Sequence, residues 1–134
     1  MPSLKTFDLF ISHAWDYNAE YYRLVEILNA APNFKWRNYS VPRHDPLAGG
    51  AQLSEQLRNQ VRPVNAVLIL AGMYVNHREW IQHEIDLAKS YTKPLIGVFP
   101  RGQERAPLQV TTSVNAMVRW NTASIVTAIR QHAL

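Results

Sequence analysis

Size, composition and charge set the first limits. The chain has 134 residues, 47% of them apolar, as in one compact domain with a single core. Without cysteine, neither a disulfide framework nor a cysteine-ligated metal site is possible. The formal charge is only +4 and the arginines are scattered, so nucleic-acid binding is not indicated. No apolar run approaches the roughly 20 residues that span a bilayer, and the N-terminal stretch lacks a secretory signal pattern. We expect one cytoplasmic domain over residues 1–134 that binds no membrane.

The first part of the chain predicts a strand, a helix and a second strand. Residues 7–11, "FDLFI", alternate as a strand does and end at the small and polar residues of "SHAW". Apolar residues then recur at helical spacing through "DYNAEYYRLVEILNAA", with Asp16 as the expected N-cap. Residues 34–38, "FKWRN", predict a short second strand. Residues 39–50 contain two prolines and two glycines, so they predict a loop.

The rest of the chain repeats this alternation. After a helix with apolar residues every four positions from Leu53 to Val61, "NAVLIL" forms the kind of uninterrupted strand that lies buried inside a parallel sheet. Residues 77–91, "HREWIQHEIDLAKSY", predict an amphipathic helix that opens with a capping box of Asn76 and Glu79. A strand "PLIGVF", a loop "PRGQERAP", an edge strand "AMVRW" and a closing helix "TASIVTAIRQHAL" complete the chain.

Strand and helix thus alternate about five times, which predicts a single doubly wound α/β domain with a five-stranded, mainly parallel sheet. Such sheets bind ligands at the carboxyl ends of their strands, near the point where the strand order reverses. The segments that follow the first three strands, residues 12–16, 39–50 and 72–77, are rich in polar and aromatic groups. We therefore expect the functional site at this edge, beside the first turns of the helix over 77–91.

One residue breaks the amphipathic pattern of that helix. At about 100° per residue, Glu84 falls inside the apolar arc, between Trp80 and Ala88. A carboxylate that faces a core costs several kcal/mol unless it is paired, hydrogen-bonded or opens into a cleft. One interpretation is structural, with the carboxylate tied to a buried arginine or to backbone amides. The second interpretation is functional, a site that stabilises positive charge or binds a sugar diol. A cleft-facing Trp80 one turn before Glu84 favours this second interpretation.

Other familiar sites find little support. Neither G-x-G-x-x-G nor G-x-x-x-x-G-K-[ST] occurs, which argues against a dinucleotide oxidoreductase or an ATPase. The histidines lack a metal-binding spacing, since His77 and His83 lie on different sides of their helix, so we expect no metal. Ser12 and His13 have no acidic third member visible in the sequence, which makes a serine hydrolase a weak hypothesis.

Four stretches together resemble the TIR-domain family: "FDLFISHAWDY", the proline-bearing "NYSVPRHDPL", "VNAVLILAGMYVNHREWIQHEIDLAKS" and "KPLIGVFP". The similarity runs from about residue 6 to about residue 130 and points to the TIR-like bacterial branch represented by the TIR protein of Thoeris anti-phage defence. Its most specific parts are "FISHAWDY" and the W-x-x-x-E element that ends at Glu84. The resemblance implies the flavodoxin-like TIR fold, in agreement with the periodicity.

The resemblance also implies an activity. In catalytically active TIR domains, a glutamate on the helix after the third strand is required to cleave the nicotinamide-ribose bond of NAD, and that position is Glu84 here. The loops after the first and second strands would line the NAD site. On this basis the expected substrate-binding residues are Ser12, His13, Asp45, Met73, Tyr74 and Trp80.

Two functional hypotheses follow. The first is an NAD nucleosidase or ADP-ribosyl cyclase that makes an ADP-ribose-derived, cyclic signal on infection, with NAD as substrate and no cofactor. A separate effector protein would sense the product, and a homotypic assembly would be active, because a lone shallow crevice would leave the ribosyl cation open to water. The second hypothesis is a non-catalytic TIR module that acts through homotypic assembly. In either case the loop over 39–50 is expected to serve as a lid or a subunit contact.

Overall fold

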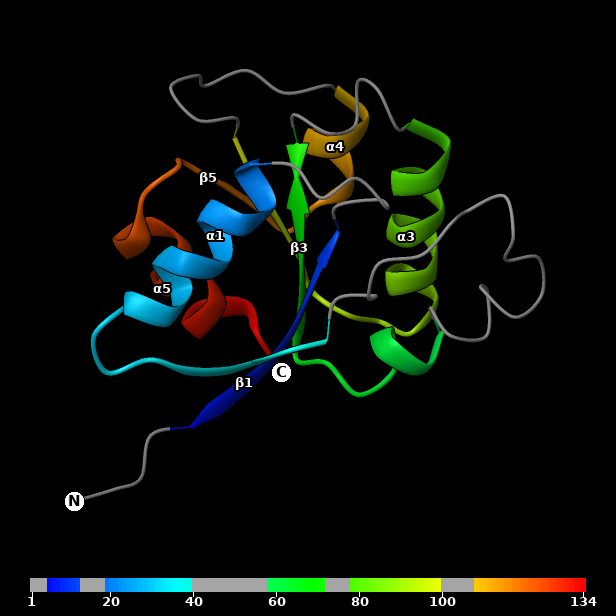
Figure 1. Cartoon of the computed structure of the whole chain (residues 1–134). Coiled ribbons are helices and arrows are strands. Elements are labelled where there is room, and N and C mark those ends of the chain that lie inside the picture. Colours follow the sequence, from blue (N-terminus) through cyan, green and yellow to red (C-terminus); the bar gives the residue numbers. More distant parts are fainter. Residues whose placement is uncertain (1–4, 13–18, 40–57, 72–77, 100–107) are drawn as a thin grey trace.

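The computed structural model describes residues 5–12, 19–39, 58–71, 78–99 and 108–134, with the backbone alone at 12, 19, 20, 78–80 and 109. Residues 58–61 are helical and precede the third strand. The other elements alternate along the chain (Figure 1). In order they are β1 (Thr6–Ser12), α1 (Ala19–Ala30), β2 (Lys35–Asn38), β3 (Ala66–Leu70), α3 (Arg78–Ser90), β4 (Leu95–Val98), α4 (Leu108–Ser113), β5 (Ala116–Val118) and α5 (Thr122–His132).

The strands form one sheet in the order β2-β1-β3-β4-β5. Every described pairing is parallel, with Leu9 of β1 opposite Ala66 of β3 and Val67 of β3 opposite Leu95 of β4. The strand order reverses between β1 and β3, because β2 lies on the outer side of β1. The prediction of a flavodoxin-like, five-stranded parallel sheet is therefore confirmed.

Helices cover both faces of the sheet. Figure 1 shows α1 and α5 on one face and α3 and α4 on the other. All residues of β3 are buried, as expected of a central strand whose two faces both meet helices. The helices contribute buried aliphatic side chains to the same core, among them Leu24, Leu28, Ile81, Ile85, Ile125 and Ile129.

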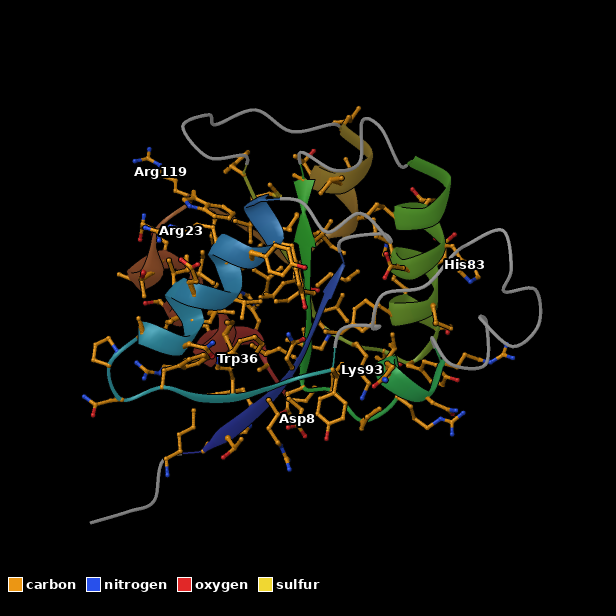
Figure 2. All side chains as sticks on the ribbon, in the orientation of Figure 1. Asp8, Arg23, Trp36, His83, Lys93 and Arg119 are labelled. Carbon is orange, nitrogen blue, oxygen red and sulfur yellow. The ribbon has the colours of Figure 1, made fainter. Side chains whose placement is uncertain are left out.

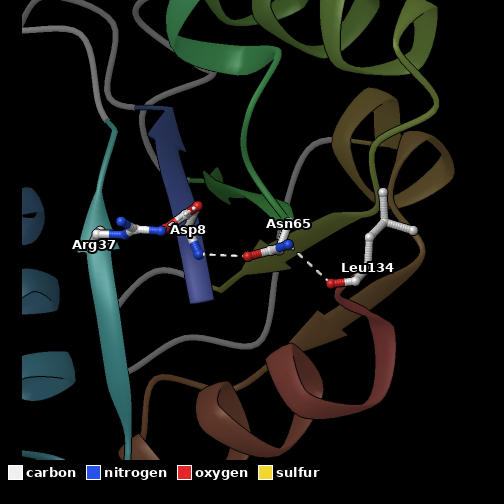
Figure 3. Close-up of polar contacts among 4 residues, drawn as sticks. All are labelled: Asp8, Arg37, Asn65 and Leu134. Carbon is white, nitrogen blue, oxygen red and sulfur yellow. Dashed lines mark hydrogen bonds and ion pairs between the residues drawn. The ribbon is translucent and has the colours of Figure 1, made fainter. Parts of the chain in front are cut away.

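Asparagine side chains hold the amino ends of neighbouring strands together. The side chain of Asn65, just before β3, accepts a hydrogen bond from the Asp8 amide of β1 at 2.7 Å and donates one to the Leu134 carbonyl at 3.0 Å (Figure 3). Its backbone amide donates to the Asp8 carbonyl at 2.6 Å, and its carbonyl accepts from the Leu134 amide at 3.0 Å. Asn115, just before β5, likewise accepts from the Leu95 amide of β4 at 2.8 Å and donates its amide to the Leu95 carbonyl at 2.7 Å. Each asparagine thereby sets the register of one strand against its neighbour.

The sequence pattern does not predict α4. Its residues include Val110, Thr111 and Thr112, whose β-branched side chains lower helix propensity. In the structure Val110 is fully buried, and the hydroxyls of Thr111 and Thr112 donate to the Leu108 carbonyl at 3.1 and 2.8 Å. Tertiary packing and local hydrogen bonds therefore make this short segment helical in spite of its composition.

Several expected features fall outside the described residues. These are the Asp16 cap, the Asn76 half of the capping box and the loop beyond Tyr39. The strand predicted over 7–11 is one residue longer at each end, because β1 begins at Thr6, opposite Lys35, and ends at Ser12, opposite Ile69 of β3. Within the described ranges, no helix is long and apolar enough to cross a membrane.

Candidate functional site

The carboxyl ends of β1 and β3 lie side by side at the point where the strand order reverses. Ser12, the last residue of β1, is opposite Ile69 of β3. Helix α3 begins at Arg78, after the carboxyl end of β3, and returns along the sheet toward the amino end of β4. The first turns of α3 therefore lie at the edge where a doubly wound sheet binds its ligands.

Glu84 lies on the buried face of α3. Only 2% of its surface is exposed, and it is the one charged or polar side chain that is buried within the described part of the chain. Ile81, Ile85 and Ala88 are fully buried on the same face, whereas His83 is exposed and points away from the sheet (Figure 2). The prediction that Glu84 interrupts the apolar face of this helix is confirmed.

The position of Glu84 along α3 also matters. Glu84 is the sixth residue after Arg78, the first residue of α3, and so lies about 9 Å farther along the helix axis. Helical side chains incline toward the helix N-terminus, and the N-terminus of α3 lies at the carboxyl edge of the sheet. From this general tilt we expect the Glu84 side chain to incline toward this edge rather than toward the amino ends of the strands.

The other predicted site residues are described only in part. The backbone of Ser12 ends β1 and the backbone of Trp80 lies in the first turn of α3, so both positions are at the carboxyl edge, with Glu84 four residues after Trp80 along α3. The side chains of these two residues lie outside the described part of the structure. The remaining predicted residues, His13, Asp45, Met73 and Tyr74, lie outside it altogether.

Sequence reasoning missed a hydrogen bond beside this edge. The side-chain amide of Asn38, the last residue of β2, donates to the hydroxyl oxygen of Tyr21 at 3.0 Å. Tyr21 lies in the first turn of α1, so this bond joins the end of β2 to the start of α1. Next in the chain, the Tyr39 amide donates to the Leu9 carbonyl at 2.8 Å. The sequence signal for this bond is a polar residue at the end of a strand together with a tyrosine at the start of the preceding helix.

A hollow of about 430 Å³ lies elsewhere, between β5 and α5. The sheet separates it from Glu84, because α5 and α3 cover opposite faces (Figure 1). It is therefore not the predicted site. Its lining residues are Ala116, Met117, Val118, Ala123, Ser124, Thr127, Ala128, Gln131 and His132. In the described ranges, no three His, Asp or Glu side chains are placed to share a metal ion.

Comparison with known families gives one match. Residues 10–105, about seven tenths of the chain, match the family model described as Thoeris protein ThsB, TIR-like domain. The match begins inside β1, includes the helix that carries Glu84 and ends before α4. No curated protein gives a significant match. The parallel sheet, the position of α3 and the extent of this match agree, and the chain belongs to the family of TIR-like domains of the Thoeris protein ThsB.

Proposed function

We propose that this TIR-like protein cleaves the nicotinamide-ribose bond of NAD in anti-phage defence, with Glu84 as the catalytic residue. Membership of a Thoeris family supports the role in defence. The observation that carries the enzymatic part is the buried Glu84 carboxylate, on the helix that begins after the carboxyl end of the central strand. Buried acids are rare in cores, and those in apolar surroundings beside a ligand-binding edge are typical of functional sites.

The chemistry needs little more than a carboxylate at the right place. The C–N bond breaks with its electron pair moving to the nicotinamide nitrogen, so nicotinamide leaves as a neutral base and needs no general acid. Positive charge then develops on the ribosyl carbon, and a nearby carboxylate lowers the energy of that transition state, as in glycoside cleavage. Capture by water gives ADP-ribose and releases one proton. Capture by a group of the same molecule gives a cyclic product, and a site that excludes water favours the second outcome.

Access to Glu84 is part of the proposal. With 2% of its surface exposed, the carboxylate can meet a ribosyl group only after neighbouring atoms move apart. We propose that assembly with a second copy promotes this rearrangement and shields the site from water, and that the segments bearing Ser12, His13, Asp45, Met73, Tyr74 and Trp80 contribute to it. The cyclic product would be read by a separate effector protein.

Replacing Glu84 by glutamine tests the proposal. Nicotinamide release is measured by chromatography on purified protein from dilute to concentrated samples, and in cells before and after phage infection. We expect E84Q to lower the rate by about 100-fold or more, because the swap is nearly isosteric and removes only the charge. The matched control is D86N, which changes an exposed carboxylate on the same helix and should keep the full rate.

Two outcomes would contradict the proposal. One is a folded E84Q protein that releases nicotinamide as fast as the parent protein. The other is a parent protein that releases none at any concentration or after infection, which would favour the non-catalytic interaction module. Circular dichroism and a thermal melt of each variant distinguish lost catalysis from lost folding. A rate per subunit that stays flat with concentration would argue against the part played by assembly.

A further inference from the structure

The fold gathers basic residues that the sequence scatters. Strands of a parallel sheet all begin at one edge, and the helices that connect them end at that same edge. This amino edge therefore gathers the residues just before or at the start of strands and those in the last turns of helices. Six cations at or near these positions are here called the amino-edge cluster: Lys5, Lys35, Arg37, Arg62, Lys93 and Arg130. Arg37 is the third residue of β2 and is included because its partner Asp8 is level with Asn65, just before β3.

Register and hydrogen bonds show how close members of the cluster are. Arg37 of β2 is opposite Asp8 of β1, and the Asp8 backbone bonds to both the backbone and the side chain of Asn65 (Figure 3). Because Val67 is opposite Leu95, Asn65 is level with Lys93, two residues before Leu95. Arg37 and Lys93 thus end a row that crosses three strand spacings, about 14 Å. Duplex DNA carries about eight phosphates over that length of its axis.

Contacts with aromatic rings and carbonyl oxygens hold three of these cations in place. The Lys5 ammonium lies 5.1 Å from the Phe7 ring centre and donates to the Leu134 carbonyl at 2.6 Å. The Arg62 guanidinium lies 5.8 Å from the Tyr91 ring centre. Such contacts orient a cation without cancelling its charge.

Arg130 is held in the same way. Its guanidinium lies 5.8 Å from the Phe34 ring centre and donates to the Asn33 carbonyl at 2.7 Å. In the described part of the chain, the ion pair that involves the cluster is Arg37 with Asp8. The six cations of the cluster and the Asp8 carboxylate together carry a formal charge of +5.

We propose that the amino-edge cluster binds nucleic acid through its phosphate backbone, without reading the base sequence. A polyanion matches the uncompensated charge, and a phosphate backbone needs no apolar anchor. A protein partner would need one, because the centres of protein interfaces are apolar and poor in lysine. Among the described residues, the large apolar side chains that are exposed are Tyr22, Leu108 and Leu134, and only Leu134 contacts the cluster. The cluster lies at the edge opposite to Ser12 and the start of α3, so bound nucleic acid would leave the proposed catalytic edge open.

The test is fluorescence anisotropy with a labelled duplex and a labelled single strand of about 20 bases, titrated at several salt concentrations between about 50 and 200 mM. We expect binding that weakens steeply with salt and does not depend on base sequence. The variant K35Q/K93Q should lower the affinity at least tenfold at about 0.1 M salt, since each lost phosphate contact lowers it about eightfold there, and should flatten the salt slope.

The matched control is R23Q/R119Q, which removes the same charge from residues far from Lys93 (Figure 2). It should change the affinity less than about twofold, because those residues would not contact phosphate. Equal weakening by both double variants, or no binding at the lowest salt, would overturn the proposal. Tighter binding to vesicles of anionic phospholipid would also overturn it, because the ligand would then be a lipid surface. Displacement of the oligonucleotide by oligoglutamate of equal charge would do the same, because the ligand would then be an acidic peptide. Equal melting temperatures of the variants would show that the comparison concerns binding and not folding.

Discussion

Removing the side chain of Asn65 should destabilise the whole sheet, because one residue holds β1, β3 and the segment after α5. In Asn65→Ala the Asp8 amide loses its side-chain acceptor at a part-buried position, which costs about 1–2 kcal/mol. The Leu134 carbonyl loses one donor but keeps the Lys5 ammonium at 2.6 Å, so this loss adds about 0.5–1 kcal/mol. The expected decrease in the free energy of unfolding is therefore about 1.5–3 kcal/mol. With 134 residues, that corresponds to a melting temperature lower by about 5–11 °C.

Urea unfolding followed by circular dichroism measures this change. The midpoint of Asn65→Ala should fall while the slope with denaturant stays the same, because the native and unfolded surfaces are unchanged. Asn29→Ala is the matched control, since the Asn29 side chain also accepts one hydrogen bond, from the Trp36 indole at 2.9 Å, but at an exposed position. It should cost less than about 1 kcal/mol. A loss at Asn65 no greater than at Asn29 would refute the view that this junction is a major source of stability.

Two further predictions concern packing and charge. Gly97→Ala should lower the free energy of unfolding by about 1–3 kcal/mol, because the added Cβ would collide with the Met117 sulfur. In a Met117→Ala background the same change should cost less. An equal cost in both backgrounds would contradict this explanation. The hydrogen bond from Asp8, followed by its charge, raises the pKa of Arg37 above its ordinary value. A raised folded-state pKa gives stability that is present at lower pH and is lost only as pH rises through that strongly basic value. The difference in melting temperature between the parent protein and Arg37→Gln should therefore stay constant from about pH 7 to pH 10, and a marked decline across that range would be inconsistent with this pairing.

The fold could be predicted because its signals are local and repeated. The uninterrupted strand β3 and the amphipathic helix α3 are each visible in a window of a few residues, and their alternation leaves few possible topologies. Helix α4 could not be predicted, because it depends on the burial of Val110 against other elements rather than on its own composition. The same is true of the Asn65 junction, whose partners lie 57 and 69 residues away in the chain.

The functional residues likewise include some that could be predicted from the sequence and some that could not. Glu84 could be identified from the sequence because a single charged residue on an apolar helix face is a local anomaly, and the structure places it on that buried face. Its role in NAD cleavage stays a prediction. The amino-edge cluster is not visible as a basic run in the sequence, since Lys5 and Arg130 are at opposite ends of the chain and the parallel topology brings their elements to one edge.

The C-terminal end of α3 is held firmly at the amino edge of the sheet. At its C-terminal end, the Lys93 amide donates to the Ala88 carbonyl at 2.9 Å, and the Thr92 amide donates to the Lys89 carbonyl at 3.0 Å. Thr92 has a φ of 57°, a left-handed conformation that a β-branched residue adopts only when its surroundings impose it. The helix is therefore fixed where it meets β4, at the amino edge. Any movement that uncovers Glu84 should then take place at the N-terminal half of α3, at the carboxyl edge, where the proposed reaction needs access. A helix anchored at one end can thus expose a buried carboxylate while the core around β3 stays packed.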